Sequence, residues 1–146
     1  MHTSIRDGVL LVSLCVCGTV AIGARTPQDH QRPPEGGVRQ HRQAARIRNA
    51  VPSSAASIAA GQELYQQQCA GCHGDTGQGD GALGEELNPK PSNLTDADWK
   101  HGSTDGEIYT VIREGVKSTG MKGYSRKMTT YQVWDVVNYV RSIGPK

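Results

Sequence analysis

The chain has 146 residues, a formal net charge of +2 and 36% hydrophobic residues, so it has room for one small domain with extensions. All seven aromatic residues lie between Tyr65 and Tyr139, which places the folded domain at residues 58–146. This part carries nine Lys and Arg against eleven Asp and Glu, a net charge of −2. We expect no nucleic-acid partner for such a domain.

Residues 8–24 form the first element along the chain. They carry no charge and include an apolar run from Val9 to Ile22, preceded by Arg6 and followed by Gly23 and Ala24. This pattern is typical of a secretory signal cleaved near its small residues. An uncleaved membrane anchor is the alternative, since about 17–25 residues span a bilayer. We therefore expect a periplasmic or otherwise extracytoplasmic protein, either released or anchored.

Residues 25–57 differ in composition. They contain six arginines, two acidic residues and no aromatic residue, a net charge of +4. Such a segment buries too little apolar surface to offset its ordering entropy, so we predict a flexible linker. Its charge can hold it against anionic lipid, or the linker is simply solvated.

Three helices are predicted in the domain. The first starts at about Ser57, a suitable N-cap, and runs to residue 69. The second and third start with capping boxes at Thr104–Glu107 and Thr129–Gln132, and end at Gly115 and at Gly144. No segment shows sustained strand alternation, so the predicted class is all-α. Apolar residues at helical spacing are expected to be buried: Ile58, Leu64, Ile108, Val111, Ile112, Val133, Trp134, Val136, Val137, Val140 and Ile143.

The pentapeptide Cys69-Ala70-Gly71-Cys72-His73 is the strongest motif. Two thiols three residues apart can add to the two vinyl groups of one porphyrin edge, and the adjacent imidazole can then bind the iron. The pattern predicts covalent attachment of one haem c. The domain would then fold as helices and glycine-rich loops wrapped around it.

Other interpretations of this pentapeptide are weaker. A structural zinc site needs four ligands, yet no cysteine follows Cys72 and His101 is the only further histidine of the domain. A dithiol redox site should lie near a strand–helix–strand pattern, which we do not find. The string Gly79–Gly84 matches a dinucleotide-binding motif, but no strand precedes it.

With these features placed, residues 58–146 resemble the class I c-type cytochromes, the small single-haem electron carriers. Gly61 and Tyr65 stand eight and four residues before Cys69, where this family has a small residue and an aromatic one. The segments 89–94 and 134–140 resemble its haem-edge loop and its closing helix. The likeness is greatest to bacterial carriers and to cytochrome subunits fused to oxidases or dehydrogenases. It implies that Tyr139 and Val136 pack against the first helix.

The resemblance also implies the iron ligands. His73 would bind one face of the haem, and Met121 would present its thioether to the other. Met128 is a rival, although its place before the third helix suits an apolar packing role, and an open or His101-bound site is a third option. Lys122 replaces the proline that usually follows the ligand methionine, which should loosen the loop. The implied pocket residues are Pro91, Asn93, Leu94, Ile112 and Tyr124.

Histidine and thioether ligation leaves no vacant site for substrate and favours ferrous iron, so we predict a one-electron carrier rather than an enzyme. It would serve an extracytoplasmic respiratory or dehydrogenase-linked chain. The alternatives are a haem-based sensor and a fixed electron-entry subunit of a larger oxidoreductase. Its partners would be redox proteins of unidentified donor and acceptor. An acidic docking surface on them would suit the basic residues around Met121: Lys117, Lys122, Arg126 and Lys127.

Overall fold

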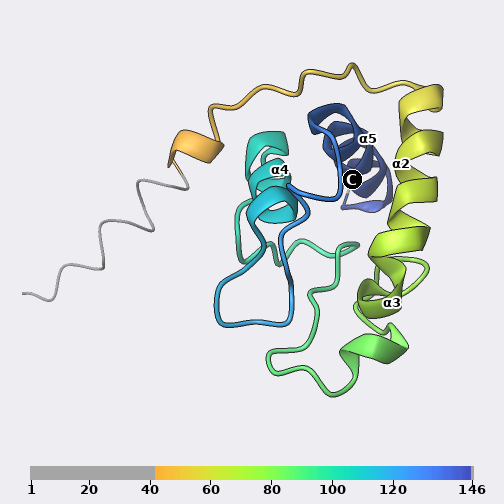
Figure 1. Cartoon of the computed structure of the whole chain (residues 1–146), viewed down its shortest axis with the longest axis vertical. Coiled ribbons are helices and arrows are strands. Elements are labelled where there is room, and N and C mark those ends of the chain that lie inside the picture. Colours follow the sequence, from red (N-terminus) through yellow and green to blue (C-terminus); the bar gives the residue numbers. More distant parts are fainter. Residues whose placement is uncertain (1–41, 146) are drawn as a thin grey trace, which may run out of the picture. The chain divides into compact units, whose positions relative to one another are not determined.

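The structure is a computed structural model that describes residues 42–145. Within this range it contains four α-helices that carry labels, a short helical turn at residues 42–44, one short 3-10 helix and no strand, which confirms the all-α prediction (Figure 1). An isolated antiparallel bridge joins Gly115 to Lys122. The elements are α2 (Ala55–Gln68), α3 (Ala70–His73), η1 (Ala82–Gly84), α4 (Asp105–Glu114) and α5 (Thr130–Ile143).

The predicted signal or anchor at residues 8–24, and the linker from 25 to 41, lie outside the described residues. Among residues 42–145, none of the helices has the length and apolar character needed to span a bilayer.

The N-cap of α2 lies three residues earlier than predicted. This N-cap is Ser54, whose hydroxyl oxygen accepts a hydrogen bond from the Ser57 amide. The prediction of Ser57 as N-cap was therefore wrong. The Ser57 side chain is buried and donates to an Asp135 carboxylate oxygen at 2.6 Å. The Ser57 hydroxyl is therefore engaged by Asp135 of α5 and does not cap α2.

The predicted starts of α4 and α5 are confirmed. Thr104 and Glu107 form a reciprocal capping box, and so do Thr129 and Gln132. α4 is followed by the predicted C-cap Gly115, whose φ of 74° lies in the left-handed region that glycine adopts readily. The two capping boxes give hydrogen-bond partners to amide groups that would otherwise lack them at the starts of α4 and α5.

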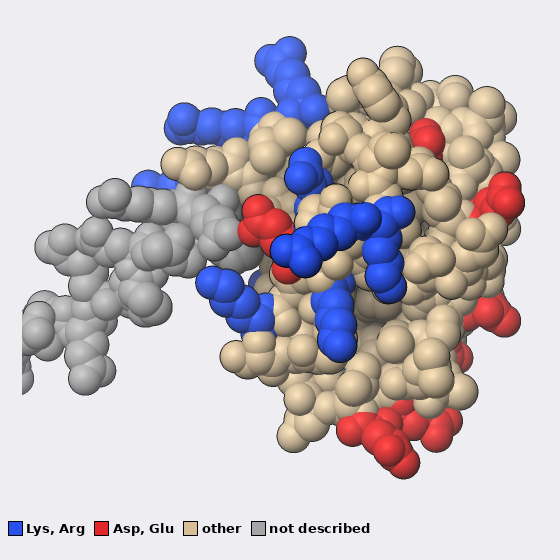
Figure 2. All heavy atoms as spheres, viewed as in Figure 1, with Lys and Arg blue, Asp and Glu red and all other residues tan. Residues whose placement is uncertain are grey.

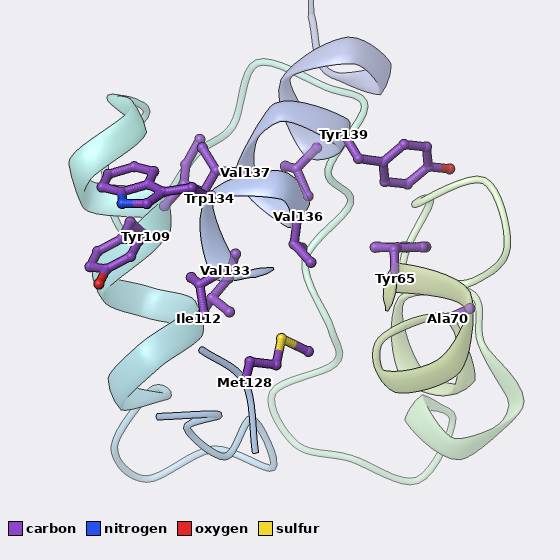
Figure 3. Packing of buried hydrophobic residues seen from close by; sticks show 12 residues of the cluster. Tyr65, Ala70, Tyr109, Ile112, Met128, Val133, Trp134, Val136, Val137 and Tyr139 are labelled. Atoms are coloured by element: carbon purple, nitrogen blue, oxygen red, sulfur yellow. The ribbon is translucent and has the colours of Figure 1, made fainter. Parts of the chain in front are cut away.

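The crossing of α2 and α5 forms one side of the core. Gly61 lies against the Asp135 backbone, where even a Cβ would overlap the Asp135 carbonyl group. This close approach brings Tyr65 beside Tyr139, with ring centroids 5.1 Å apart, and Val136 is buried in the same cluster (Figure 3). The packing expected for Gly61, Tyr65 and Tyr139 is thus confirmed.

The other side of the core joins α4 to α5. Tyr109 and Trp134 stack with centroids 4.0 Å apart and planes inclined by 15° (Figure 3). Met128 is buried in this cluster, directly before the Thr129 N-cap. Ile112 of α4 completes the apolar layer.

Residues 42–54, here called the N-terminal strap, pack on the domain. Ala44 is buried, and its carbonyl oxygen lies so close to Gly106 that a Cβ there would overlap it. The Asn49 amide donates to Asn138 of α5 at 2.8 Å, and Asn138 donates to the carbonyl of Val51 at 3.2 Å. The C-terminal part of the segment predicted to be a flexible linker is therefore part of the folded unit, held by polar contacts across 89 residues of sequence.

Charge is divided between two parts of the domain. Residues 58–98 hold seven acidic residues and one lysine, whereas residues 99–146 hold four acidic and eight basic residues. Figure 2 shows Lys and Arg spread over the left and middle of one face, around α4 and the loop that follows it. Most of the acidic side chains in this view lie along the right and lower edges.

Candidate functional site

The motif cysteines lie where α2 passes into α3. The Cys69 amide still donates to the Tyr65 carbonyl at 2.8 Å, and the His73 amide donates to the Cys69 carbonyl at 2.9 Å. These bonds hold Cys69, Cys72 and His73 on one short helical segment. Both cysteines are free thiols, and both are half-buried.

His73 is fixed by a backbone partner. Its Nδ1 lies 3.0 Å from the carbonyl oxygen of Ser92. Since a carbonyl only accepts, Nδ1 carries the proton and Nε2 carries the lone pair. Burial lowers the pKa of His73 below its ordinary value, with the Ser92 bond as a smaller opposing effect. The imidazole is therefore oriented and neutral, as a metal ligand must be.

The thiol of Cys69 does not suit dithiol redox chemistry. Burial, and to a lesser extent the neighbouring Cys72, raises its pKa to about 11. Reactive thiols in redox enzymes have lowered pKa values, because the thiolate is the nucleophile. Among residues 42–145 no three His, Cys, Asp or Glu side chains gather into a metal-binding group.

Glycines let the following loop pack against the motif. A Cβ on Gly81 would lie 2.5 Å from the carbonyl oxygens of Ala70 and Gly71. Gly79, with a φ of 80°, donates its amide to the His73 carbonyl at 2.7 Å. The loop thus contacts the backbone of α3 closely and supports the motif from outside.

The proline-containing loop at residues 89–94 reaches the motif through its backbone. Ser92 accepts from His73, and the Leu94 amide donates to the Gly77 carbonyl at 2.7 Å. The Pro91 ring packs against Gly84 so closely that a Cβ at position 84 would lie 2.6 Å from Pro91 Cγ. The Asn93 side chain accepts from the amide and hydroxyl of Thr95, so in this structure it stabilises a local turn.

Met121 lies in the loop between α4 and α5. Its carbonyl accepts from the Val116 amide at 3.0 Å, and its own amide donates to the Thr119 hydroxyl at 3.1 Å. Its side chain is half-buried, whereas Met128 is buried in the core. This burial agrees with the packing role expected for Met128 at the start of α5.

Tyr124 connects this loop to the motif. Its hydroxyl donates to the Gln68 carbonyl at 2.7 Å, directly before Cys69. Its amide donates to the carbonyl of Ile112 in α4 at 2.9 Å. Burial raises the pKa of Tyr124, which keeps the hydroxyl protonated as a donor. The loop carrying Met121 is therefore tied to both α2 and α4.

Ser92 and Gln68 are the two contacts that the sequence did not reveal. Both act through backbone carbonyl oxygens, which every residue type possesses, so residue identity carries no signal for them. His101, the other histidine of the domain, is half-buried in the loop before α4.

The sequence pattern that defines the cytochrome c family matches residues 58–144, more than half of the chain. The chain therefore belongs to the cytochrome c family. Members of this family carry covalent haem c, and the half-buried thiol pair and the oriented imidazole fit that group.

Several relatives are oxidase subunits. The chain is 28% identical over 96 residues to the cbb3-type cytochrome c oxidase subunit CcoP of Azospirillum sp. B510, covering 66% of this chain and 32% of that protein. It is 33% identical over 93 residues to CcoP of Cereibacter sphaeroides, covering 62% of this chain and 29% of that protein. The chain thus matches about a third of the length of these relatives.

Solved structures agree on the fold. A Kuenenia stuttgartiensis reducing HAO-like protein complex, Kustc0457/Kustc0458, gives a TM-score of 0.60 at 25% identity, covering 67% of this chain and 49% of the other. Cytochrome cL of Methylophaga aminisulfidivorans gives 0.52 at 25% identity, covering 61% and 57%. The chain is an electron-transfer cytochrome related to oxidase cytochrome subunits.

Proposed function

We propose that this chain is a one-electron carrier, not an enzyme, in which His73 and Met121 are the axial ligands of one covalent haem c. The observation that carries the proposal is the hydrogen bond from His73 Nδ1 to the Ser92 carbonyl, which leaves the lone pair on Nε2 of the residue that directly follows Cys72. The bound haem would supply reversible one-electron chemistry.

Each residue of the site has a separate task. Cys69 and Cys72 attach the cofactor as thioethers, and Ser92 holds the imidazole in one tautomer and one orientation. Tyr124 ties the Met121 loop to α2 and so limits how far the thioether can move. Pro91, Leu94 and Ile112 are proposed to line the pocket, where apolar surroundings disfavour the ferric charge.

The two methionines allow a matched test. In haem-loaded protein, Met121→Leu should abolish the thioether–ferric-haem charge-transfer band and lower the reduction potential. Met128→Leu is the control, since it keeps the band and changes only core packing. A redox titration with spectra measures both quantities. Loss of the band in the Met128 variant instead would assign the ligand to Met128.

A fixed subunit of a larger oxidoreductase is the second candidate. It is favoured by the relatives, whose names identify oxidase subunits. Native purification distinguishes the two roles, because a subunit co-purifies at fixed stoichiometry whereas a mobile carrier does not. We place the protein on the extracytoplasmic side, where the cleaved or retained segment 8–24 would deliver it.

A haem-based sensor is the remaining alternative, because Lys122 stands where the resemblance to class I cytochromes implies a proline. A sensor needs a displaceable Met121. Ferrous protein that binds carbon monoxide readily under native conditions would support the sensor and contradict the carrier.

Partner docking is proposed at the basic collar, defined as Lys117, Lys122, Arg126 and Lys127. All four side chains are exposed, and Lys127 Nζ lies 5.6 Å from the centroid of the Tyr124 ring. A positive collar steers an acidic redox partner and speeds encounter at low salt. Lys122→Gln with Lys127→Gln should slow electron transfer at low salt, and the difference should vanish at high salt.

A further inference from the structure

A groove on the domain shares only Arg126 with the basic collar, and its other lining residues have none of the roles above. We propose that it binds a carboxylate-rich segment of a partner protein, at a docking site separate from the thiol and imidazole groups. The strap supplies one wall, α4 supplies the floor and the loop after Met121 supplies the other wall. The residues that carry the argument are Ile47, Tyr109, Arg113, Glu114, Ser125 and Arg126.

Arg113 is held in place before any partner arrives. Its Nη1 donates to the Tyr109 hydroxyl oxygen at 2.9 Å, and its guanidinium lies over the Tyr109 ring at 5.6 Å from the centroid. Tyr109 is in turn stacked on buried Trp134. Because the guanidinium is already ordered, binding costs less side-chain entropy than it would at a free arginine.

The groove offers hydrogen-bond donors. The Tyr109 oxygen accepts from Arg113, so its own O–H remains free to donate. Arg126 adds a second guanidinium, and Ser125 adds a hydroxyl. Ionised carboxylates only accept, and guanidinium pairs with them in strong two-pronged bonds. Two guanidinium groups outweigh the single carboxylate of Glu114, so the groove selects anions.

The charges around the groove act in the same direction. Arg46 and Arg48 flank Ile47 and are exposed. The acidic residues are concentrated in residues 58–98, and Figure 2 shows most of those in view away from the middle of the basic face. This division of charge gives the domain a dipole, which orients an acidic partner toward the groove during approach.

A protein segment fits this site better than a membrane does. The Arg113 guanidinium is half-buried and fixed in direction by Tyr109, whereas a flat lipid surface would contact the exposed arginines of the strap first. The loop wall is also tied to α4, because the Ser125 amide donates to the Arg113 carbonyl at 3.2 Å. A partner held here would lie beside the loop that carries Met121, and only this last consequence rests on the proposed ligation.

The test uses the haem-loaded full chain and a fluorescently labelled hexaglutamate peptide. Anisotropy should report saturable binding that weakens with salt. Arg113→Gln with Arg126→Gln should raise the Kd by about tenfold or more, equivalent to the loss of charge-assisted bonds. Arg126→Gln alone, in an exposed loop, should raise it by a smaller factor without affecting folding.

Lys90→Gln with Lys100→Gln is the charge-matched control, since both lysines are exposed and neither lines the groove. It should change the Kd by less than about twofold. Equal weakening in the control and the groove variant would overturn the proposal, and so would failure of the peptide to bind. Vesicles of phosphatidylglycerol and phosphatidylcholine test the membrane alternative. The proposal also fails if the groove substitutions abolish vesicle binding while the peptide does not bind.

Discussion

The α2–α5 pair and the glycine-rich segment between α3 and α4 are stabilised by different interactions. The helices are joined by side chains: Tyr65 meets Tyr139, and Val136 fills the space beside them. The segment 74–103 is joined to the motif by backbone bonds, namely those from the Gly79 amide to the His73 carbonyl and from the Gly81 amide to the Cys72 carbonyl. The first region gives the domain its stability, and the second gives His73 its direction.

The largest effect is expected where the two helices touch. Gly61→Ala would place a methyl group inside the Asp135 backbone and against Tyr139, so α2 and α5 must separate. We expect a loss of about 3 kcal/mol of unfolding free energy, at the upper end for overpacking. Ala60→Ser, at an exposed position of α2, should cost less than about 0.5 kcal/mol. Urea unfolding of the haem-loaded variants measures both.

Cys69 lies at the junction of the two regions. In the folded haem-free chain its pKa of about 11 leaves little thiolate at pH 8, and the thiolate fraction rises as pH approaches that value. Alkylation of Cys69 should therefore be roughly a hundredfold slower in the folded chain than in urea, where the pKa returns to about 9. Peptide mapping after timed iodoacetamide treatment checks this. Equal rates would show that the motif is not buried in the haem-free chain.

The N-terminal strap is attached to α5 by polar contacts, so substitutions there measure how much such contacts contribute to stability. Asn138, only 3% exposed, bonds to Asn49, to the Val51 carbonyl and to the Ser57 hydroxyl. Asn138→Ala leaves these groups without partners and should cost about 2 kcal/mol. Asn49→Ala removes a smaller set of contacts and should cost about half as much.

Limited proteolysis adds a local measurement to this prediction. The Asn138 variant should be cut within residues 42–54 faster than the parent protein, while cleavage elsewhere is unchanged. Unchanged cleavage of the strap would mean that Asn138 contributes to the core alone.

The smallest effect is expected in the Met121 loop. In the described part of the chain, the Lys122 amide takes part in none of the backbone hydrogen bonds of this loop, so a proline there removes no donor that the fold uses. Lys122→Pro should stabilise the protein by about 0.5 kcal/mol by restricting the unfolded chain. Lys122→Gln is the control, because it removes the charge without adding the proline ring. Thermal unfolding should show a higher Tm for Lys122→Pro than for Lys122→Gln.

The regions also differ in how far they could be predicted. α4 and α5 were placed correctly because their capping boxes are local: Thr104 and Glu107, like Thr129 and Gln132, are three residues apart. The start of α2 was misplaced because Ser57 bonds to Asp135, 78 residues away. Local patterns cannot contain a contact of that range.

The candidate site shows the same division. The thiols and the imidazole are identified by residue type and spacing alone, so Cys69, Cys72 and His73 could be named from the sequence. The partner of His73 could not, because Ser92 contributes only its carbonyl oxygen. The strap was missed for a related reason, since its arginine-rich composition hides the few polar groups that attach it to α5.

The absence of a side chain at Gly61 has a consequence for the order in which the helices pack. α2 packs along α5, and α5 follows the haem-attachment motif by more than fifty residues of sequence. We therefore expect a chain that ends before α5 to leave this face of α2 uncovered, because no other described helix packs on it as extensively. The order of synthesis makes this contact the last one that the two helices can form.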